Sequence, residues 1–413
     1  MFNSKYKKLL NQVIKTSTPP KKEIQDMKIL AEGILSELKK TGIKATIGGS
    51  LAKNTLIKKE NQDVDIFVEF NSEKETKNLE KVLKKIKTKG KIITVHGSRD
   101  YFRIEFPKVS LEIIPTVICK NPEKAKNITD LSISHVRYVT KKIRKSKKLA
   151  DEIKLAKIFC SASDCYGAES YIQGFSGYAL ELLVIQFGSF TKFIKRIEKN
   201  KIIDLENKFK NENEISRELN ESKLISPIIL IDPTYKYRNV TAALSKETFD
   251  KFLKYIKDFL KKPTIEHFQK KIINKEEIRN YAKQTNSKYL EIKITTKKQE
   301  GDIAGTKMKK YFNFFIQQLK NKEQEILIEE FEYKGNGQKA TGYIVVKEKK
   351  RIEICGPEIK RKEATREFKK GKKEIFERKG FIWTMEEPSI KNIFQKAKRI
   401  EKEMDVKVEM KIN

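Results

Sequence analysis

Two short segments near the N-terminal end have residue types and spacing suited to chemistry on a nucleoside triphosphate. Residues 47–50 (IGGS) read as a small-residue turn, and residues 63–70 (DVDIFVEF) follow after a short basic segment. In an extended strand alternate residues face the same side, so Asp63 and Asp65 project together while the apolar residues between them face a core. The pattern predicts two carboxylates on a rigid strand beside a turn that can hold phosphates.

A third carboxylate is expected from a neighbouring strand. In residues 110–115 (SLEIIP) the lone acidic residue, Glu112, lies on the face opposite Leu111 and Ile113. Nucleotidyl transfer uses two divalent ions roughly 3.5 to 4 Å apart, one at the attacking oxygen and one at the leaving pyrophosphate. Magnesium prefers oxygen ligands, so Asp63 and Asp65 can bridge both ions and Glu112 can complete the attacking-side site. We therefore predict a two-metal nucleotidyltransferase that uses Mg²⁺.

The turn before the acidic strand supplies the expected phosphate contacts. Gly48 and Gly49 let the backbone approach a triphosphate, and the amide and hydroxyl of Ser50 can donate to its oxygens. Lys53 follows one helical turn later on the same side. Taken alone, the turn is better interpreted as an ordinary turn, and the aspartates alone as a solvated strand face. The third acidic strand residue favours the nucleotidyltransferase interpretation.

The composition indicates a polyanionic partner. Lys and Arg number 90 against 56 Asp and Glu, a formal net charge of +34. The alternative is that a lysine-rich composition reflects the organism. The four cysteines have no zinc-binding spacing and are expected to be reduced, and no run approaches the roughly 18 apolar residues of a membrane span. We expect a soluble, cytoplasmic protein whose basic runs at 141–148 and 369–373 meet phosphates.

The hydrophobic periodicity predicts an α+β protein of several domains. A catalytic head is expected over residues 1–138, a helical neck without strands over 139–262, and an α+β body and tail over 263–413. The expected head elements are an amphipathic N-terminal helix, helices at 24–38 and near 74–88, and strands at 45–47, 63–70, 92–95, 101–106 and 109–118. The expected neck helices are 139–159, 174–198 and 246–260, with a polar linker or frayed helix at 200–223. The expected body and tail elements are strands at 289–295, 351–355, 381–385 and 406–412, helices at 303–320, from 361 and at 389–403, and a hairpin at 334–337.

Several motifs resemble one family. Residues 47–50 (IGGS) and 63–70 (DVDIFVEF) resemble the signature of the polymerase-beta superfamily, in which hG[G/S]S is followed by [D/E]h[D/E]h. Residues 49–55 (GSLAKNT) are similar to the GSxxRNT motif of one family within it. The family resembled is that of the archaeal class I CCA-adding enzymes, and its motifs run in order along nearly the whole chain. The further matches are 166–169 (YGAE) with 174–178 (GFSGY) and 181–183 (ELL), 232–233 (DP) with 238–245 (RNVTAALS), and 356–357 (GP) with 380–383 (GFIW).

The resemblance implies a polymerase-beta-like head with a mixed sheet, a helical neck, and a body and tail that bind the acceptor and TΨC arms of tRNA. It implies template-independent addition of C, C and A to the tRNA 3′ end from CTP and ATP. By the same resemblance, Asp63, Asp65 and Glu112 bind metal, and Arg238 reads the base edge with Asp232 as its orienting partner. The implied nucleotide-binding residues are Gly49, Ser50, Lys53, His135, Lys157, Tyr166 and Arg238.

The chain departs from the family pattern at three places. Glu112 stands where aspartate is usual. Lys53 stands where arginine is usual, and it keeps the positive charge but cannot form the paired, bidentate hydrogen bonds of a guanidinium. The segment between His135 and Lys157 is also a few residues longer than is typical. His135 and Tyr178 have alternative interpretations as core residues. The alternatives for function are a poly(A) polymerase-like terminal RNA nucleotidyltransferase and a non-catalytic RNA-binding protein, and a homodimer is left open.

Overall fold

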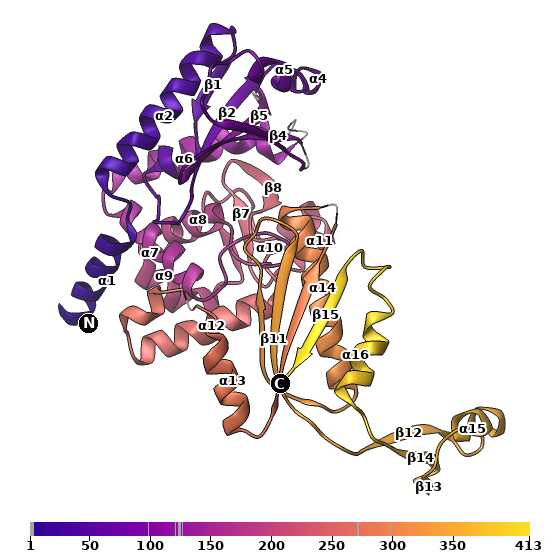
Figure 1. Cartoon of the computed structure of the whole chain (residues 1–413). Coiled ribbons are helices and arrows are strands. Elements are labelled where there is room, and N and C mark those ends of the chain that lie inside the picture. The colour runs from indigo at the N-terminus through magenta and orange to yellow at the C-terminus, as the bar shows by residue number, and fades with distance from the viewer. Residues whose placement is uncertain are drawn as a thin grey trace. The chain divides into compact units, whose positions relative to one another are not determined.

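The computed structural model describes residues 4–97, 99–119, 121–122, 125, 127–270, 272–297 and 299–413. The chain folds into two compact units (Figure 1). The first comprises Met1–Ala168 with Ile172–Lys270, and the second comprises Glu169–Tyr171 with Lys271–Asn413. The division of the first unit into a head and a neck at residue 138 stays a prediction. Among the described residues, no helix is long and apolar enough to cross a membrane.

The first unit begins with a mixed five-stranded sheet in the order β1-β2-β5-β4-β3. Strands β2 and β5 run parallel, and the other neighbours are antiparallel. Alternate β2 residues such as Val64 and Ile66 are buried with the apolar face of helix α2. The other face of β2 is therefore free to carry acidic side chains. The elements are α2 (Lys21–Lys40), β1 (Lys44–Ile47), α3 (Gly49–Lys53), β2 (Gln62–Phe70), β3 (Lys91–Val95), β4 (Tyr101–Phe106) and β5 (Val109–Val117).

The sequence predictions for this sheet are confirmed except for one helix. The helix expected near 74–88 is two short helices, α4 (Glu73–Thr76) and α5 (Leu79–Leu83). The apolar residues that anchor this segment in the core are Leu79, Leu83 and Ile86, and none of them lies in α4. The lysine-rich turns around them gain no burial, and a short helix without packing is marginal in water.

A predominantly helical region follows, with one large core that includes Phe159, Phe252 and Phe259. Two helices expected to be continuous are each divided in two. A break at residues 146–148 separates α6 from α7, and Gly188, at φ 79°, ends α8 before the Ser189 side chain caps α9. The helices are α1 (Ser4–Ser17), α6 (Ser132–Lys145), α7 (Leu149–Ala162), α8 (Gly177–Phe187), α9 (Phe190–Arg196) and α12 (Lys246–Lys261).

The expectation that this region lacks strands is wrong. A small sheet in the order β6-β7-β8 lies within it, and the expected linker at 200–223 contributes a strand and two short helices. These strands have three to five residues, too few to show a clear alternation of apolar and polar side chains. The elements are β6 (Ile202–Asp204), α10 (Glu212–Glu218), α11 (Glu221–Leu224), β7 (Ile229–Asp232) and β8 (Tyr235–Asn239).

The second unit is built on an antiparallel sheet in the order β10-β11-β9-β15. Strand β11 is buried on both faces: Ile344 and Val346 belong to a core with α14 and α16, while Tyr343 and Val345 pack with α13. The predicted hairpin and the other strands are confirmed, whereas α13 and β13 were not predicted. The elements are α13 (Lys275–Gln284), β9 (Lys288–Thr295), α14 (Gly301–Asn321), β10 (Glu325–Glu332), β11 (Lys339–Lys347), β12 (Ile352–Glu358), α15 (Lys362–Lys369), β13 (Ile375–Arg378), β14 (Phe381–Glu386), α16 (Ile390–Lys398) and β15 (Lys407–Ile412).

Candidate active site

The glycine turn is built directly against the acidic strand. The backbone N–H of Gly48 donates to the carbonyl of Asp65 at 2.8 Å, and a methyl group at Gly48 would lie 2.1 Å from the ring of Phe67. Gly49 has φ +57°, and a methyl group there would lie 1.6 Å from Oδ2 of Asp65. Only glycine combines that backbone conformation with so close an approach. Ser50 follows, partly exposed, in the first turn of α3.

Three carboxylates share one face of the sheet. Asp65 lies opposite Glu112 in the parallel β2–β5 register, and Asp63 lies opposite Ser110. Burial, with repulsion from Asp65 and Asp63, raises the pKa of Glu112 to about 7. Burial also raises the pKa of Asp65, which Asp63 reinforces and Lys53 opposes. The carboxylates are therefore close enough to disfavour simultaneous ionisation.

This donor set fits a divalent metal ion. Carboxylate oxygens are the ligands that hard divalent cations prefer, and a cation would relieve the repulsion among these three groups. Two of them are paired instead with neighbouring cations: Asp63 with Lys59 at 3.3 Å and Glu112 with Arg103 at 3.1 Å. Accordingly, no group of three acidic, histidine or cysteine side chains among the described residues is already arranged as a metal cage. Each of these contacts uses one oxygen of its carboxylate, so the second oxygen of Asp63 and of Glu112 can still face a metal ion.

Two of the predicted nucleotide-binding residues, Lys53 and Lys157, meet at a buried carboxylate. The Lys53 ammonium donates to Oε2 of Glu181 at 2.7 Å, and the Lys157 ammonium donates to Oε1 at 2.8 Å. Thr55 accepts from Lys157 at 3.0 Å and donates to Oε1 of Glu181 at 3.2 Å. Burial alone would raise the pKa of Glu181, but the two ammonium groups lower it to about 2. Both lysines therefore lie in an ion cluster within the first unit.

A second cluster surrounds the carboxylate of Asp232. His135 and Arg238 approach Oδ2 at 3.0 and 3.1 Å, and Tyr178 donates to Oδ1 at 3.1 Å. The backbone N–H of Thr234 also donates to Oδ1, at 2.8 Å. An ionised carboxylate only accepts, so Nε2 of His135 carries the hydrogen and cannot accept from Arg238, 3.3 Å away. The expected Asp232–Arg238 contact is confirmed.

The remaining predicted residues connect these clusters. His135 is buried and stacks on Tyr178, with ring centroids 4.2 Å apart. Burial lowers the pKa of His135, and the charges of Arg238 and Lys53 lower it further against the effect of Asp232. Tyr178 packs on the core, as its alternative interpretation expected, and also donates to Asp232. A methyl group added at Gly177 would lie 3.0 Å from the Tyr166 hydroxyl and 3.9 Å from the Lys157 ammonium.

Sequence reasoning gave no role to four residues that complete the site: Lys59, Arg103, Thr55 and Glu181. Thr55 and Glu181 lie within motifs that the sequence showed, and Glu181 carried a further signal as a lone acidic residue in the apolar helix α8. An acidic side chain in such a setting needs a cationic partner.

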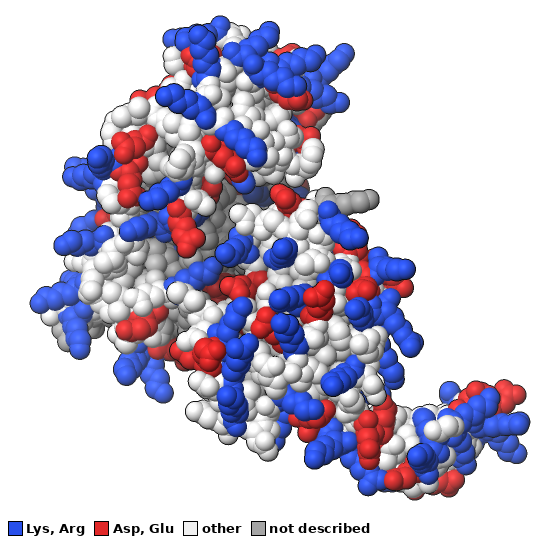
Figure 2. Space-filling view, in the orientation of Figure 1, with Lys and Arg blue, Asp and Glu red and all other residues white. Residues whose placement is uncertain are grey.

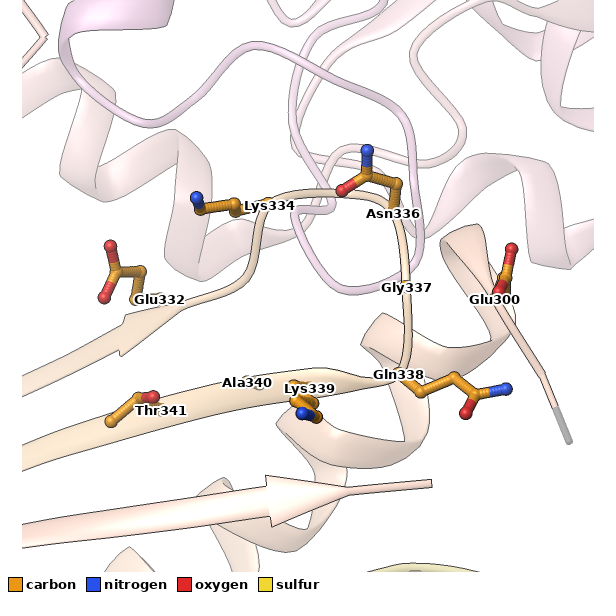
Figure 3. Close-up of a pocket in the computed structure, with 9 residues that line it drawn as sticks. All are labelled: Glu300, Glu332, Lys334, Asn336, Gly337, Gln338, Lys339, Ala340 and Thr341. Carbon is orange, nitrogen blue, oxygen red and sulfur yellow. The ribbon is translucent and has the colours of Figure 1, made fainter. Parts of the chain in front are cut away.

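A pocket in the second unit, lined by residues at the β10–β11 hairpin, has no comparable set of groups. Figure 3 shows Glu332, Asn336 and Gln338 pointing in different directions rather than toward a common point. On the face seen in Figure 2, Lys and Arg side chains are widely spread, with Asp and Glu among them. The candidate site residues named above all lie in the first unit.

Fold and site together define a nucleotidyltransferase of the polymerase-beta type. A nucleotidyltransferase domain model matches residues 28–119, and a model of the second domain of tRNA nucleotidyltransferases matches residues 151–269. Solved structures with the same fold include a cytoplasmic RNA terminal U-transferase (TM-score 0.51, 66% of this chain and 100% of that chain) and the Cid1 poly(U) polymerase (TM-score 0.53, 65% and 99%), each 12% identical.

Curated relatives narrow the class. The chain is 37% identical over 238 residues to the CCA-adding enzyme of Nanoarchaeum equitans, covering 56% of this chain and 59% of that protein. It is 34% identical over 288 residues to the CCA-adding enzyme of Pyrococcus abyssi, covering 63% and 61%. The chain is similar to the archaeal CCA-adding enzymes, the family that its motifs predicted. It spans about three fifths of the length of these relatives.

The close approach of Gly49 to Asp65 gives a first prediction. The Gly49→Ala variant should bind Mn²⁺ about tenfold or more weakly, because the new methyl group displaces a carboxylate that metal binding requires. Electron paramagnetic resonance titration measures this affinity. Gly42→Ala is the matched control, since Gly42 also has positive φ, +81°, but no atom lies within 4 Å of its added methyl group. Equal Mn²⁺ affinity in the two variants would contradict the assignment.

The Asp232 cluster predicts an acid-dependent contribution to stability. Burial opposes ionisation of Asp232, but His135 and Arg238 lower its pKa from 3.8 to about 2. A depressed folded-state pKa stabilises the fold above the ordinary pKa, and this contribution is lost as the pH falls through the folded-state value. The wild type should therefore lose about 2 kcal/mol relative to Asp232→Asn between pH 5 and pH 2.

Urea unfolding at several pH values measures this difference. Asp250→Asn, which removes an exposed carboxylate from α12, serves as the control and should follow the wild-type pH dependence. A constant difference between wild type and Asp232→Asn across this range would show that Asp232 is not held ionised by its neighbours.

Proposed function

We propose that the protein adds C, C and A to the 3′ end of tRNA without a nucleic-acid template, using CTP and ATP and releasing pyrophosphate. The observation that carries the proposal is the register of β2 and β5, which aligns Asp65 with Glu112 beside the Gly49 turn. The curated relatives named as CCA-adding enzymes support the choice of acceptor.

The carboxylates are assigned to metal and the glycine turn to phosphate. Magnesium ions held by Asp63, Asp65 and Glu112 would lower the pKa of the attacking 3′ hydroxyl and neutralise charge on the leaving pyrophosphate. Gly49 lets the backbone approach the triphosphate, and Ser50 donates to its oxygens. The phosphates also receive hydrogen bonds from Lys53, Lys157 and Tyr166.

Base recognition is assigned to the Asp232 cluster. Asp232 holds the Arg238 guanidinium at 3.1 Å, and Arg238 also lies over the ring of Tyr178, 5.8 Å from its centroid. A guanidinium fixed in this way presents its other N–H groups in a set direction, which suits hydrogen bonding to a base edge. His135, stacked on Tyr178, belongs to the same cluster.

The second unit is assigned to the acceptor and TΨC arms of tRNA. It includes the basic run at 369–373, and duplex RNA is bound mainly through its shape and backbone charge. The reaction would take place in the cytoplasm, and nothing in this proposal requires a homodimer.

Incorporation on truncated tRNA tests the function. Purified protein with Mg²⁺ should extend tRNA lacking its 3′ CCA by CMP, CMP and AMP, resolved on a sequencing gel. The control is Asp65→Asn, which removes one metal-binding charge and should lower the rate about 100-fold or more. A long A-only product on unstructured RNA would indicate a poly(A) polymerase-like enzyme. RNA binding by wild type and Asp65→Asn with no incorporation by either would indicate a non-catalytic RNA-binding protein.

Nucleotide choice tests the role of Arg238. The Arg238→Ala variant should reduce discrimination among the four nucleoside triphosphates about tenfold or more, because a site that loses its hydrogen-bond donors no longer rejects the wrong base edge. Its affinity for tRNA should change less than threefold, as measured by filter binding. The exposed Arg217→Ala in α10 controls for loss of positive charge. A larger effect on tRNA affinity than on nucleotide choice would refute the assignment.

A further inference from the structure

Glu181 is a buried acidic side chain that the reaction itself does not use. It has no exposed surface and is surrounded in α8 by buried apolar residues, including Leu180 and Leu182. Burying an ionised carboxylate costs several kcal/mol unless cations and hydrogen-bond donors compensate. The nearest donors are Lys53, Lys157 and Thr55, and each reaches the carboxylate within 3.2 Å.

The contacts divide the carboxylate between two parts of the first unit. Oε2 accepts from Lys53, at the end of helix α3, which begins with the glycine turn. Oε1 accepts from Lys157 on α7 and from Thr55, just beyond α3. The Glu181 side chain on α8 therefore links helix α3, which begins at the glycine turn, to helix α7.

Cations outnumber carboxylates within the cluster itself, and the charge of Lys53 also acts on Asp65. Two ammonium groups face one carboxylate, so the cluster by itself has a net charge of +1. Each ammonium has three N–H bonds, and the contacts above occupy one on Lys53 and two on Lys157. Lys53 ends the helix α3 that contains Ser50, and a methyl group added at Gly177 would lie near both the Tyr166 hydroxyl and the Lys157 ammonium. The N–H bonds that the cluster leaves over can therefore meet an anion.

We propose that Glu181 is a positioning residue for the triphosphate: its carboxylate holds the ammonium groups of Lys53 and Lys157 together so that their free N–H bonds point toward one phosphate site. This inference rests on the proposed function, because the phosphates are those of the incoming CTP or ATP. Glu181 does not touch the nucleotide.

The first test is CTP affinity, measured by isothermal titration calorimetry of the full-length protein with Mg²⁺. Glu181→Gln should weaken CTP binding about tenfold or more, the effect expected when a charge-assisted hydrogen bond is misplaced. Lys157→Met should weaken it similarly, because a donor is lost. Glu152→Gln is the matched control: it neutralises another carboxylate that α7 partly buries, one that accepts from the Phe190 backbone N–H and contacts neither lysine. Its CTP affinity should equal that of the wild type.

The double variant Glu181→Gln/Lys157→Met separates positioning from a purely structural role. The double variant replaces both Glu181 and Lys157 by neutral residues, which leaves Lys53 as the single cation of the cluster. Its melting temperature should therefore recover most of the loss that Glu181→Gln alone causes. CTP affinity should stay weak, because the Lys157 donor is absent. The double variant also provides the test if Glu181→Gln alone fails to fold.

Two results would overturn the inference: CTP affinity that returns together with the melting temperature in the double variant, or wild-type affinity in a folded Glu181→Gln. Failure of the proposed function is distinguishable from both. In that case the wild type would not extend truncated tRNA, whereas the pattern of CTP affinities among the variants would still hold.

Discussion

The parallel pairing of β2 with β5 is the constraint on which the rest of the site depends. The two strands are separated in the chain by the β3–β4 hairpin, and β5 returns to lie between β2 and β4. Because side chains alternate across a strand, a slip of one residue would turn Glu112 into the core and Leu111 out of it. The burial of Leu111 and Ile113 therefore also fixes the position of Glu112 opposite Asp65. Hydrophobic packing on one face of the sheet therefore determines where the carboxylate side chains lie on the other face.

Buried charges contribute to the packing of the helical region, and one of them, Glu181, also pairs with Lys53 at the end of helix α3. Glu181 and Asp232 are both fully buried, and each is surrounded by cations and hydrogen-bond donors from other elements. Removing one partner of such a pair typically costs 3 to 5 kcal/mol, whereas a well-packed apolar replacement can be neutral. Stability alone therefore does not explain these clusters. They define the positions of Lys53, Lys157 and Arg238 more narrowly than apolar packing would.

The sequence was most informative where patterns are long and local. The alternation in β2 and the apolar stripe of α2 predicted these elements to within three residues at each end. The short strands β6, β7 and β8 were missed because three to five residues cannot display a period. The candidate residues were readable from motifs, but their contacts were not: Lys53 and its partner Glu181 are separated by 128 positions. Only the fold shows that both lysines share one carboxylate.

That shared carboxylate also accounts for a departure from the family pattern. Arginine is usual at position 53, and its planar fork pairs best with both oxygens of a carboxylate. In this chain Oε1 of Glu181 is already occupied by Lys157 and Thr55, which leaves Oε2 for residue 53. A lysine, with a compact charge on a flexible stem, satisfies one oxygen without competing for the other. Lys53 is therefore consistent with the same buried cluster that positions Lys157, and the substitution is a local adjustment rather than the loss of a contact.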